Sequence, residues 1–233
     1  MSTSYEEKRI SIIRGSPSPV GATLLCSLPR GKEYVVCDIG ACDGIDSVIY
    51  SRLWPEATVF AIEAREDNVL KLKETITQFD CTEKVFPLYA TLSNCVEEVA
   101  FYRSYGESGN KPASVETGNK SSSILRPSGH IKEHPWCKFT EEKVTTVRFD
   151  SLKIPKVDFI HMDVQGAEIK VLQGMGKVLD TVTAVFLEVS SMELYEGQPL
   201  KPDVINFMRD RGFREVFDSC KGIFKSGDML WVR

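Results

Sequence analysis

Residues 34–44 read YVVCDIGACDG, and this stretch decides the fold. An apolar run that ends in an acid is typical of a strand buried on both faces of a parallel sheet. Gly40 and Gly44 then allow a tight turn and a close approach of a ligand to the backbone. Residues 45–54 follow with apolar positions on one helical face, and Pro55 ends them. The stretch therefore predicts a strand, a glycine turn and a helix in succession.

Strand and helix patterns alternate over most of the 233 residues. This alternation predicts an α/β domain with a mostly parallel, doubly wound sheet, and the last two strands predict a C-terminal antiparallel hairpin. Further strands are predicted at residues 58–63, 84–88, 96–102, 144–149, 157–164, 183–189, 214–217 and 229–232, and helices at 67–79, 167–175 and 202–211.

The pattern predicts one domain over residues 31–233, after an irregular lead-in at residues 1–30 that contains several prolines and glycines. Residues 103–143 have little periodicity and carry glycines, prolines and a run of serines. A segment of this length without regular structure is usually a lid, a binding loop or a disordered stretch. We expect it to form a lid over the site, with a surface loop as the alternative.

The composition excludes several classes of protein. The formal net charge of -4 argues against a nucleic-acid backbone as the main partner, because phosphate binding needs a basic excess. No apolar run approaches the roughly 18 residues that span a membrane, and no secretory signal is apparent. Seven cysteines occur without C-x-x-C spacing, which disfavours a zinc site. Cys37, within an apolar run, predicts a buried free thiol, so a reducing compartment and a cytoplasmic location are expected.

Acids stand where four of the predicted strands end, and ligands of doubly wound sheets bind beyond these carboxyl ends. The four are Asp38, Glu63, Asp163 and Glu188. Glu63, followed by Ala64, lies 19 residues beyond Gly44. An acid about 20 residues after a glycine turn binds both hydroxyls of a ribose. A surface acid at a strand end is the alternative interpretation.

The glycine turn supplies the other candidate cofactor-binding residues: Asp38, Gly40, Ala41, Cys42 and Gly44. Its glycines have G-x-x-x-G spacing, whereas dinucleotide enzymes carry G-x-G-x-x-G. Asp38 and Asp43 would repel a pyrophosphate, but an acid suits the ammonium of a zwitterionic amino-acid ligand. A plain strand-to-helix turn is the alternative. Together with Glu63, the turn predicts a site for the adenosine ribose of either NAD or S-adenosylmethionine.

The most specific motif is VDFIHMDVQGAE at residues 157–168, which is followed by VLQG at residues 171–174. It resembles the signature of the FkbM-type methyltransferase family, in which a strand reading D-F/L-I-K-I-D precedes V-E-G-A-E and V-L-x-G. The resemblance extends over most of the chain from Tyr34 to Glu188. The matching parts are residues 38–41 and Gly44 for the donor loop, Glu63 for the ribose acid, Ser121–Leu125 for a serine cluster, and residues 145–152 for the stretch before the signature strand.

The resemblance implies a Rossmann-like class I methyltransferase fold and S-adenosylmethionine as the methyl donor. It also implies a small hydroxylated acceptor, such as a sugar or another natural product, that is methylated on oxygen. Three positions depart from the family pattern. Cys42 stands where the family usually has Asn, His161 where it has Lys, and Gln165 where it has Glu.

Asp163 is the first candidate for the acidic residue of the site. Its carboxylate could hold the acceptor hydroxyl, accept its proton or orient the donor. His161 is the second candidate base, since histidine titrates near neutral pH and residues two apart in a strand point to the same side. A hydrogen-bonded structural histidine is the alternative. Glu188 could pair with Asp163, and the two carboxylates could hold Mg²⁺. Alternatively, each acid is bonded to backbone amides or an arginine.

The candidate acceptor and lid residues are Ser122, Ser123, His130, His134 and Trp136. Two other classes of function stay open at this point. An NAD-dependent oxidoreductase would share the ribose acid, but it should carry a fuller glycine motif and a catalytic Tyr/Lys pair or His. A non-catalytic module that binds S-adenosylmethionine is the other, and the replacement of Lys by His161 favours it.

Overall fold

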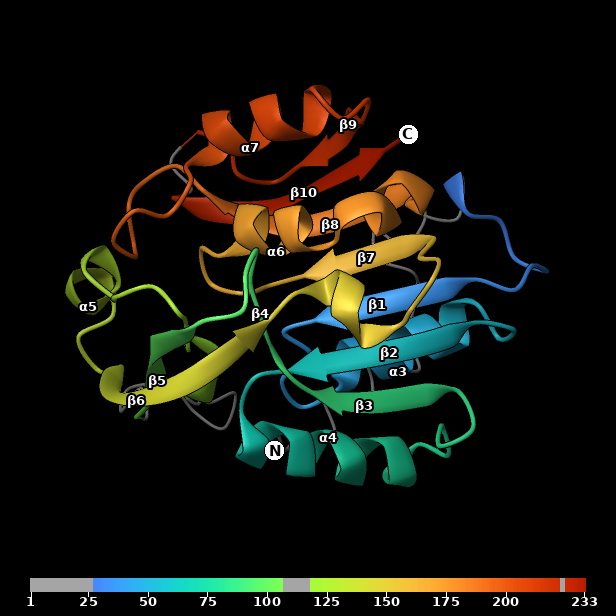
Figure 1. Cartoon of the computed structure of the whole chain (residues 1–233), viewed down its shortest axis with the longest axis horizontal. Coiled ribbons are helices and arrows are strands. Elements are labelled where there is room, and N and C mark those ends of the chain that lie inside the picture. The colour runs from blue at the N-terminus through green and yellow to red at the C-terminus, as the bar shows by residue number, and fades with distance from the viewer. Residues whose placement is uncertain (1–26, 107–117, 223–224) are drawn as a thin grey trace, which may run out of the picture.

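The computed structural model describes residues 27–106, 118–222 and 225–233 (Figure 1). Most of the predicted lead-in at residues 1–30 therefore lies outside the described residues. The elements that build the large sheet and its two faces are β1 (Val35–Ile39), α3 (Ile45–Leu53), β2 (Thr58–Glu63), α4 (Glu66–Gln78), β3 (Val85–Tyr89), β7 (Phe159–Met162), α6 (Glu168–Gly174), β8 (Ala184–Ser190), α7 (Lys201–Arg209), β9 (Arg214–Asp218) and β10 (Ser226–Val232).

Seven strands form one sheet in the order β3-β2-β1-β7-β8-β10-β9. The first five are parallel to their neighbours, while β10 runs antiparallel to both β8 and β9. The chain order reverses between β1 and β7, which is where ligands of such sheets bind. The α/β prediction, with a mostly parallel sheet and a C-terminal antiparallel hairpin, is confirmed.

Helices cover both faces of the sheet, and each face has its own hydrophobic core. Val48 of α3 and Leu72 of α4 pack against Val36 and Val59 on one face. On the other face, side chains of α6 and α7 pack with Cys37, Ile39 and Ile62, among others. Figure 1 shows α6 and α7 in front of the sheet and α3 behind it. Because both faces are covered, the central strands have the continuous apolar runs that the sequence displays.

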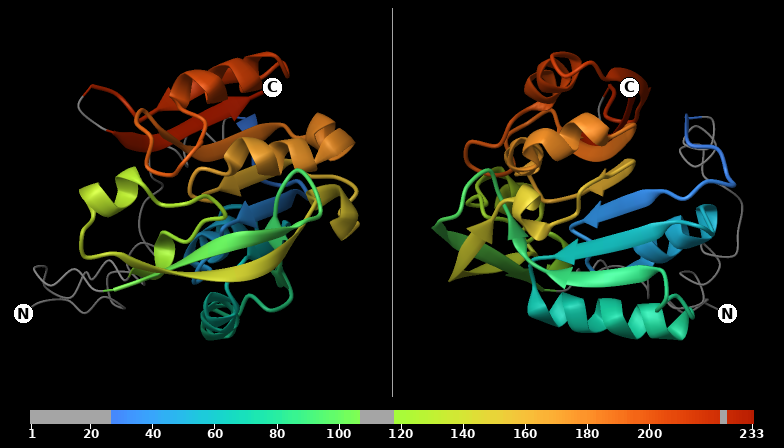
Figure 2. Two further views of the ribbon diagram at one scale, coloured as in Figure 1. Left: turned by 60° about the vertical axis from the view of Figure 1, so that its left-hand side comes forward. Right: turned by 45° about the vertical axis from the view of Figure 1, so that its right-hand side comes forward.

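The prediction of a loop over residues 103–143 is wrong at both ends, where the structure has strands. β5 (Glu98–Tyr105) extends into it, and β6 (Lys138–Val147) begins within it. These strands pair antiparallel, and β6 also pairs with β4 (Thr91–Leu92) in a three-stranded sheet. Most side chains of β6 are exposed, so it has no apolar side and gives no hydrophobic period. Figures 1 and 2 show this ribbon at the end of the large sheet where the parallel strands terminate.

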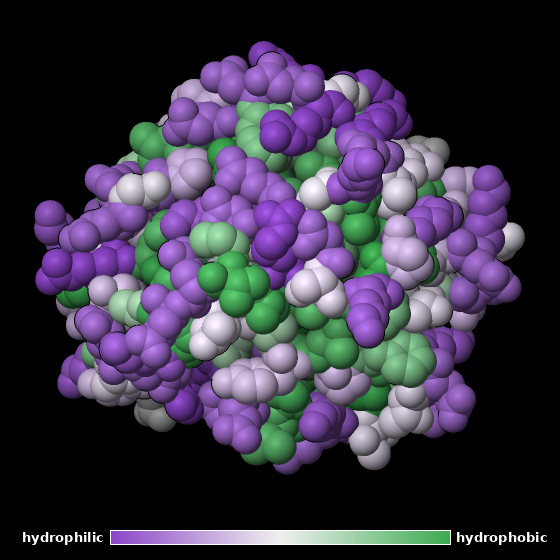
Figure 3. Space-filling view, in the orientation of Figure 1, coloured by the Kyte–Doolittle hydropathy of each residue, from purple (hydrophilic) through white to green (hydrophobic). Residues whose placement is uncertain are grey.

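The middle of that segment contains η1 (Gly118–Lys120) and α5 (Gly129–Glu133), and residues 107–117 lie outside the described part. Among the helices that the structure describes, none is long and apolar enough to cross a membrane. On the face seen in Figure 1, hydrophilic residues surround hydrophobic ones that reach the surface in separate patches (Figure 3).

Candidate active site

A cavity with an open volume of about 910 Å³ lies at the carboxyl ends of β1, β2 and β7. Ligands of doubly wound sheets bind at this position, beyond the carboxyl ends of the strands. Nine of the residues predicted from the sequence line it: Gly40, Ala41, Cys42, Glu63, Ala64, Ser122, Ser123, His161 and Asp163. The others, which lie outside its lining, are Asp38, Gly44, Glu188, His130, His134 and Trp136.

The turn after β1 is held against the neighbouring strand. The backbone N–H groups of Gly40 and Ala41 both donate to the carbonyl oxygen of Ile62, at 2.9 and 3.1 Å. Gly40 has a φ of +83°, and Cys42 follows in the left-handed region at +49°. Gly44, at the start of α3, packs against Leu72 instead of facing the cavity. The glycines therefore serve close backbone packing that shapes the cavity wall.

We expect Gly40→Ala to destabilise the protein by about 3 kcal/mol or more. A Cβ at this position would overlap the carbonyl oxygen of Asp163, and the positive φ is unfavourable for alanine. Gly197→Ala is the matched control, because Gly197 has a φ of +70° but no atom within 4 Å of an added Cβ. Chemical denaturation should show a loss near 1 kcal/mol in the control. Equal losses in the two variants would contradict the predicted close contact.

Glu63 ends β2 and faces the cavity with its side chain almost fully buried. Its two carboxylate oxygens accept backbone hydrogen bonds, one from Cys42 and one from Arg65, each at 2.8 Å. Burial raises the pKa of Glu63 above its usual range, and these N–H groups oppose the rise. The carboxyl group is thus fixed in orientation, with remaining lone pairs that can accept hydrogen bonds from a ligand.

His161 is held by Asp38 across the β1–β7 pair. Its Nδ1 lies 2.8 Å from Asp38 Oδ1, and Asp38 is fully buried and also accepts a hydrogen bond from Ser47. The imidazole lies between the rings of Phe186 and Tyr50. Burial opposes protonation, but the hydrogen bond and charge of Asp38 outweigh it and raise the pKa of His161 to about 9. A protonated imidazole cannot accept a proton, so this geometry favours the structural interpretation over the general base.

The pair of Asp38 and His161 should make folding stability depend on pH. Since the folded-state pKa of about 9 exceeds the unfolded value of 6.5, the stabilisation is complete below pH 6.5 and is lost as the pH rises towards 9. The expected loss is on the order of 3 kcal/mol. Urea denaturation across this interval should show it in the wild type and not in His161→Gln. Parallel pH profiles of the two proteins would rule out a raised pKa.

Asp163 and Glu188 are joined by the amide of Gln165. Gln165 Nε2 donates to Asp163 Oδ1 at 2.6 Å and to Glu188 Oε2 at 2.9 Å, and its Oε1 accepts from the hydroxyl of Tyr195 at 2.8 Å. Burial and the neighbouring charges of Asp163 and Glu168 raise the pKa of Glu188 well above its usual range. This shift favours the protonated form of Glu188, and Asp163 is the member of the pair that lines the cavity.

The turn that carries Gln165 is shaped by Glu168, the first residue of α6. Glu168 Oε1 accepts the backbone N–H groups of Val164 and Gly166 at 3.2 and 3.1 Å. Gln165 and Gly166 both have positive φ values, +53° and +95°. Ser123 Oγ donates to the Gln165 carbonyl at 2.8 Å, so the serine cluster lies directly on this turn. In the described part of the chain, no group of three or more His, Cys, Asp or Glu side chains is placed to hold a metal ion.

The three predicted aromatic lid residues lie together, away from the cavity lining. The rings of His130 and His134 are 4.8 Å apart, and those of His134 and Trp136 are 6.1 Å apart. His130 is buried beside Tyr195, and its backbone N–H donates to the carbonyl of Leu194 at 2.9 Å. Burial lowers the pKa of His130 to about 4. These contacts attach α5 to the segment that follows β8.

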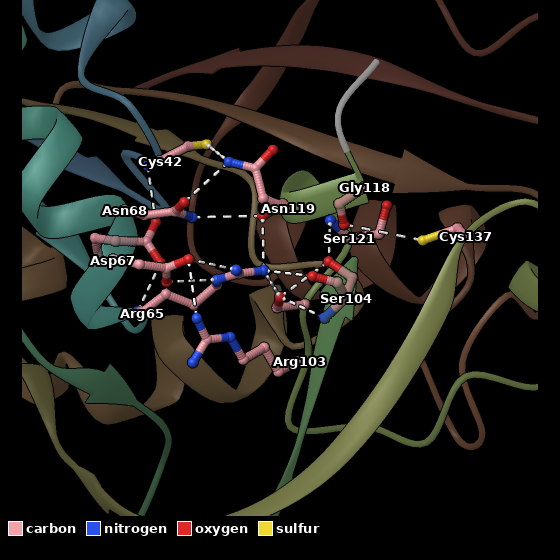
Figure 4. A network of polar contacts seen from close by, with 12 residues as sticks. Cys42, Arg65, Asp67, Asn68, Arg103, Ser104, Gly118, Asn119, Ser121 and Cys137 are labelled. Carbon is pink, nitrogen blue, oxygen red and sulfur yellow. Dashed lines mark hydrogen bonds and ion pairs between the residues drawn. The ribbon is translucent and has the colours of Figure 1, made fainter. Parts of the chain in front are cut away.

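The sequence reasoning missed several cavity residues. Arg65, Asn68 and Asn119 line it, as do Asp46 and residues 90–92 after β3. Asn119 Nδ2 donates to Asn68 Oδ1 at 2.9 Å, and the guanidinium of Arg65 reaches the carbonyl of Asn119 (Figure 4). Asp46 carried a signal, because an acid in the first turn after the glycine motif is close to the β1 end. The other side chains become neighbours only through contacts between segments distant in sequence.

Comparisons with known proteins identify the family. A family model described as the methyltransferase FkbM domain matches residues 38–215. The chain is 31% identical over 183 residues to the 2-O-methyltransferase NoeI of Sinorhizobium fredii, covering 76% of this chain and 72% of that protein. It is 27% identical over 190 residues to the hexuronic acid methyltransferase AglP of Haloferax volcanii, covering 78% and 70% of the two chains.

Among solved structures, the methyltransferase FkbM of Methylobacillus flagellatus matches with a TM-score of 0.55 and 12% identity, over 100% of this chain and 56% of that one. That likeness supports the fold alone. The length of the family match and the identity to the first relative show the family. They favour a methyltransferase over the NAD-dependent oxidoreductase that the sequence motifs left open. This protein belongs to the FkbM-type methyltransferase family and is an S-adenosylmethionine-dependent methyltransferase.

Proposed function

We propose that this enzyme methylates a hydroxyl group of a sugar or a related small molecule, with Asp163 as the group that accepts the proton. The observation that carries the proposal is the position of Asp163. It lies on the cavity wall at the end of β7 and is hydrogen-bonded to Gln165, which also binds Glu188. The two curated relatives support a sugar acceptor, because one is named a 2-O-methyltransferase and the other a hexuronic acid methyltransferase.

The lining of the cavity fits the donor. Glu63 presents a carboxyl group, held by two backbone N–H groups, that suits the two hydroxyls of a ribose. Asp43 and Asp46 also line the cavity and supply acidic groups for the ammonium of the donor. When bound, S-adenosylmethionine supplies a methyl group that is already electrophilic. The side chains then need to orient the acceptor oxygen and take up its proton.

In this mechanism Asp163 accepts the hydroxyl proton while Gln165 fixes the orientation of its carboxylate. The raised pKa of Glu188 favours its protonated form, which limits the negative charge in the pair. His161 acts as a partly buried cation that positions the end of β7, in place of the lysine usual for the family. A divalent cation between Asp163 and Glu188 stays a prediction that the assay below includes. In the described residues, Cys37, Cys81 and Cys137 are buried free thiols, which supports a reducing compartment such as the cytoplasm.

The first experiment is calorimetric titration with S-adenosylmethionine, S-adenosylhomocysteine and NAD. We expect the first two to bind and NAD not to bind. Transfer of a labelled methyl group to a panel of neutral sugars, uronic acids and phenols, with and without Mg²⁺, then tests the acceptor. Donor binding without transfer to any hydroxylated acceptor would contradict the proposed activity and favour a non-catalytic module.

A further inference from the structure

Arg65 carries a guanidinium group that is only 5% exposed, which is rare for a charged side chain unless it is paired. On one side, Nε and Nη2 donate to the two oxygens of Asp67 at 3.1 and 2.7 Å. This two-point contact lowers the pKa of Asp67 to about 2, so the carboxylate stays charged at neutral pH. The pair fixes the plane of the guanidinium at the start of α4.

The other side of the guanidinium contacts the segment between β5 and β6. Its Nη1 donates to the carbonyl of Ser104 at 2.6 Å, to Ser122 Oγ at 3.1 Å and to the carbonyl of Asn119 at 3.4 Å (Figure 4). Ser122 and Asn119 both line the cavity. Ser122 Oγ also accepts the backbone N–H of Ser104 at 3.0 Å. The guanidinium is therefore at the centre of the bonds that hold this wall together.

The backbone of the same residue contacts the end of β2. The N–H of Arg65 donates to Glu63 Oε1 at 2.8 Å and so fixes the proposed ribose acid. One residue thus joins the acid of the donor site to the wall supplied by a segment 39 to 57 positions further along the chain. If Arg65 served only to form a surface ion pair with Asp67, none of these further contacts would be needed.

We propose that Arg65 is a positioning residue for the donor, which sets the distance between Glu63 and the wall formed by Asn119 and Ser122. It acts through these groups and does not touch the reacting atoms. A guanidinium suits this role because it is planar and presents five N–H donors in fixed directions. A lysine would keep the charge but could not bind Asp67 at two points and the three groups of the wall at once.

The test compares Arg65→Lys with Arg103→Lys. Arg103 is the matched control, because its Nη2 also binds Asp67, at 2.9 Å, while its side chain is 39% exposed and does not line the cavity. We expect Arg65→Lys to raise the Kd and the KM of S-adenosylmethionine about tenfold, as loss of charge-assisted hydrogen bonds does. The kcat at saturating donor should change less than about threefold, and the control should bind the donor within about twofold of the wild type.

A purely structural role would lower the unfolding temperature and leave the Kd of the folded protein unchanged, and that result would overturn the inference. Ser122→Ala gives a second measurement, which tests the inference even if Arg65→Lys fails to fold. It should weaken donor binding, and the double variant should bind no more weakly than Arg65→Lys alone. Normal donor binding by Ser122→Ala would also overturn the inference.

The inference rests on the proposed donor site, so the wild type is titrated first. Failure of the wild type to bind would refute that site itself, whereas normal binding by Arg65→Lys would refute only the role of Arg65.

Discussion

Asp163→Asn should lower kcat by about 10²- to 10⁴-fold, the usual contribution of a positioned general base. The substitution keeps the size of the side chain and an oxygen that can accept the bond from Gln165, which is 2.6 Å long in the wild type. It removes the negative charge that would take the acceptor proton. The Kd of S-adenosylmethionine should stay within about threefold, since Glu63, which is proposed to bind the donor ribose, is unchanged in this variant.

Steady-state kinetics with a methylated sugar as product measure kcat. Calorimetry with S-adenosylmethionine measures the donor Kd. Asp180→Asn is the control, because Asp180 is exposed after α6 and does not line the cavity. An unchanged kcat in Asp163→Asn would remove this carboxylate from the chemistry. A loss confined to donor binding would assign Asp163 to orienting the donor.

Glu63→Gln is expected to raise the Kd of S-adenosylmethionine by about 100-fold. The wild-type carboxyl group uses both oxygens to accept N–H bonds, from Cys42 and from Arg65. A glutamine has one oxygen, so its NH₂ group would face one of these donors, and the charge that binds the ribose hydroxyls would be lost. The turnover of the donor-saturated enzyme should fall far less, because Glu63 ends β2 whereas Asp163 follows β7, on the other side of β1.

Calorimetric titration gives the donor affinity, and Glu66→Gln is the matched control. Glu66 begins α4 three residues later and is exposed, so its variant should bind the donor like the wild type. Thermal unfolding should confirm that both variants are folded at the temperature of the titration. Normal donor binding by Glu63→Gln would mean that the ribose lies elsewhere in the cavity.

The apolar runs and the acids at their ends were sufficient to predict the central strands and where their ligands would bind. A strand buried on both faces must be apolar throughout, and this constraint is local, so it is visible in a single stretch such as residues 34–44. The glycine turn, Glu63 and Asp163 were predicted for the same reason, because each lies next to such a strand. Strands at residues 96–102 and 144–149 were predicted, but the continuation of β5 to Tyr105 and the start of β6 at Lys138 were missed, since most side chains of β6 are exposed and leave no hydrophobic period.

The sequence alone determined that the chain forms a doubly wound α/β domain with a line of acids at one edge of its sheet. Only the tertiary structure decided what surrounds those acids. His161 meets Asp38 across 123 positions, and this contact raises its pKa to about 9, which favours a partly buried cation over a base. Arg65, which resembles an ordinary charged residue at the start of a helix, is buried by partners 39 to 57 positions away. The pKa of a group and the role of a charge depend on such neighbours, and no local pattern specifies which distant segments will meet.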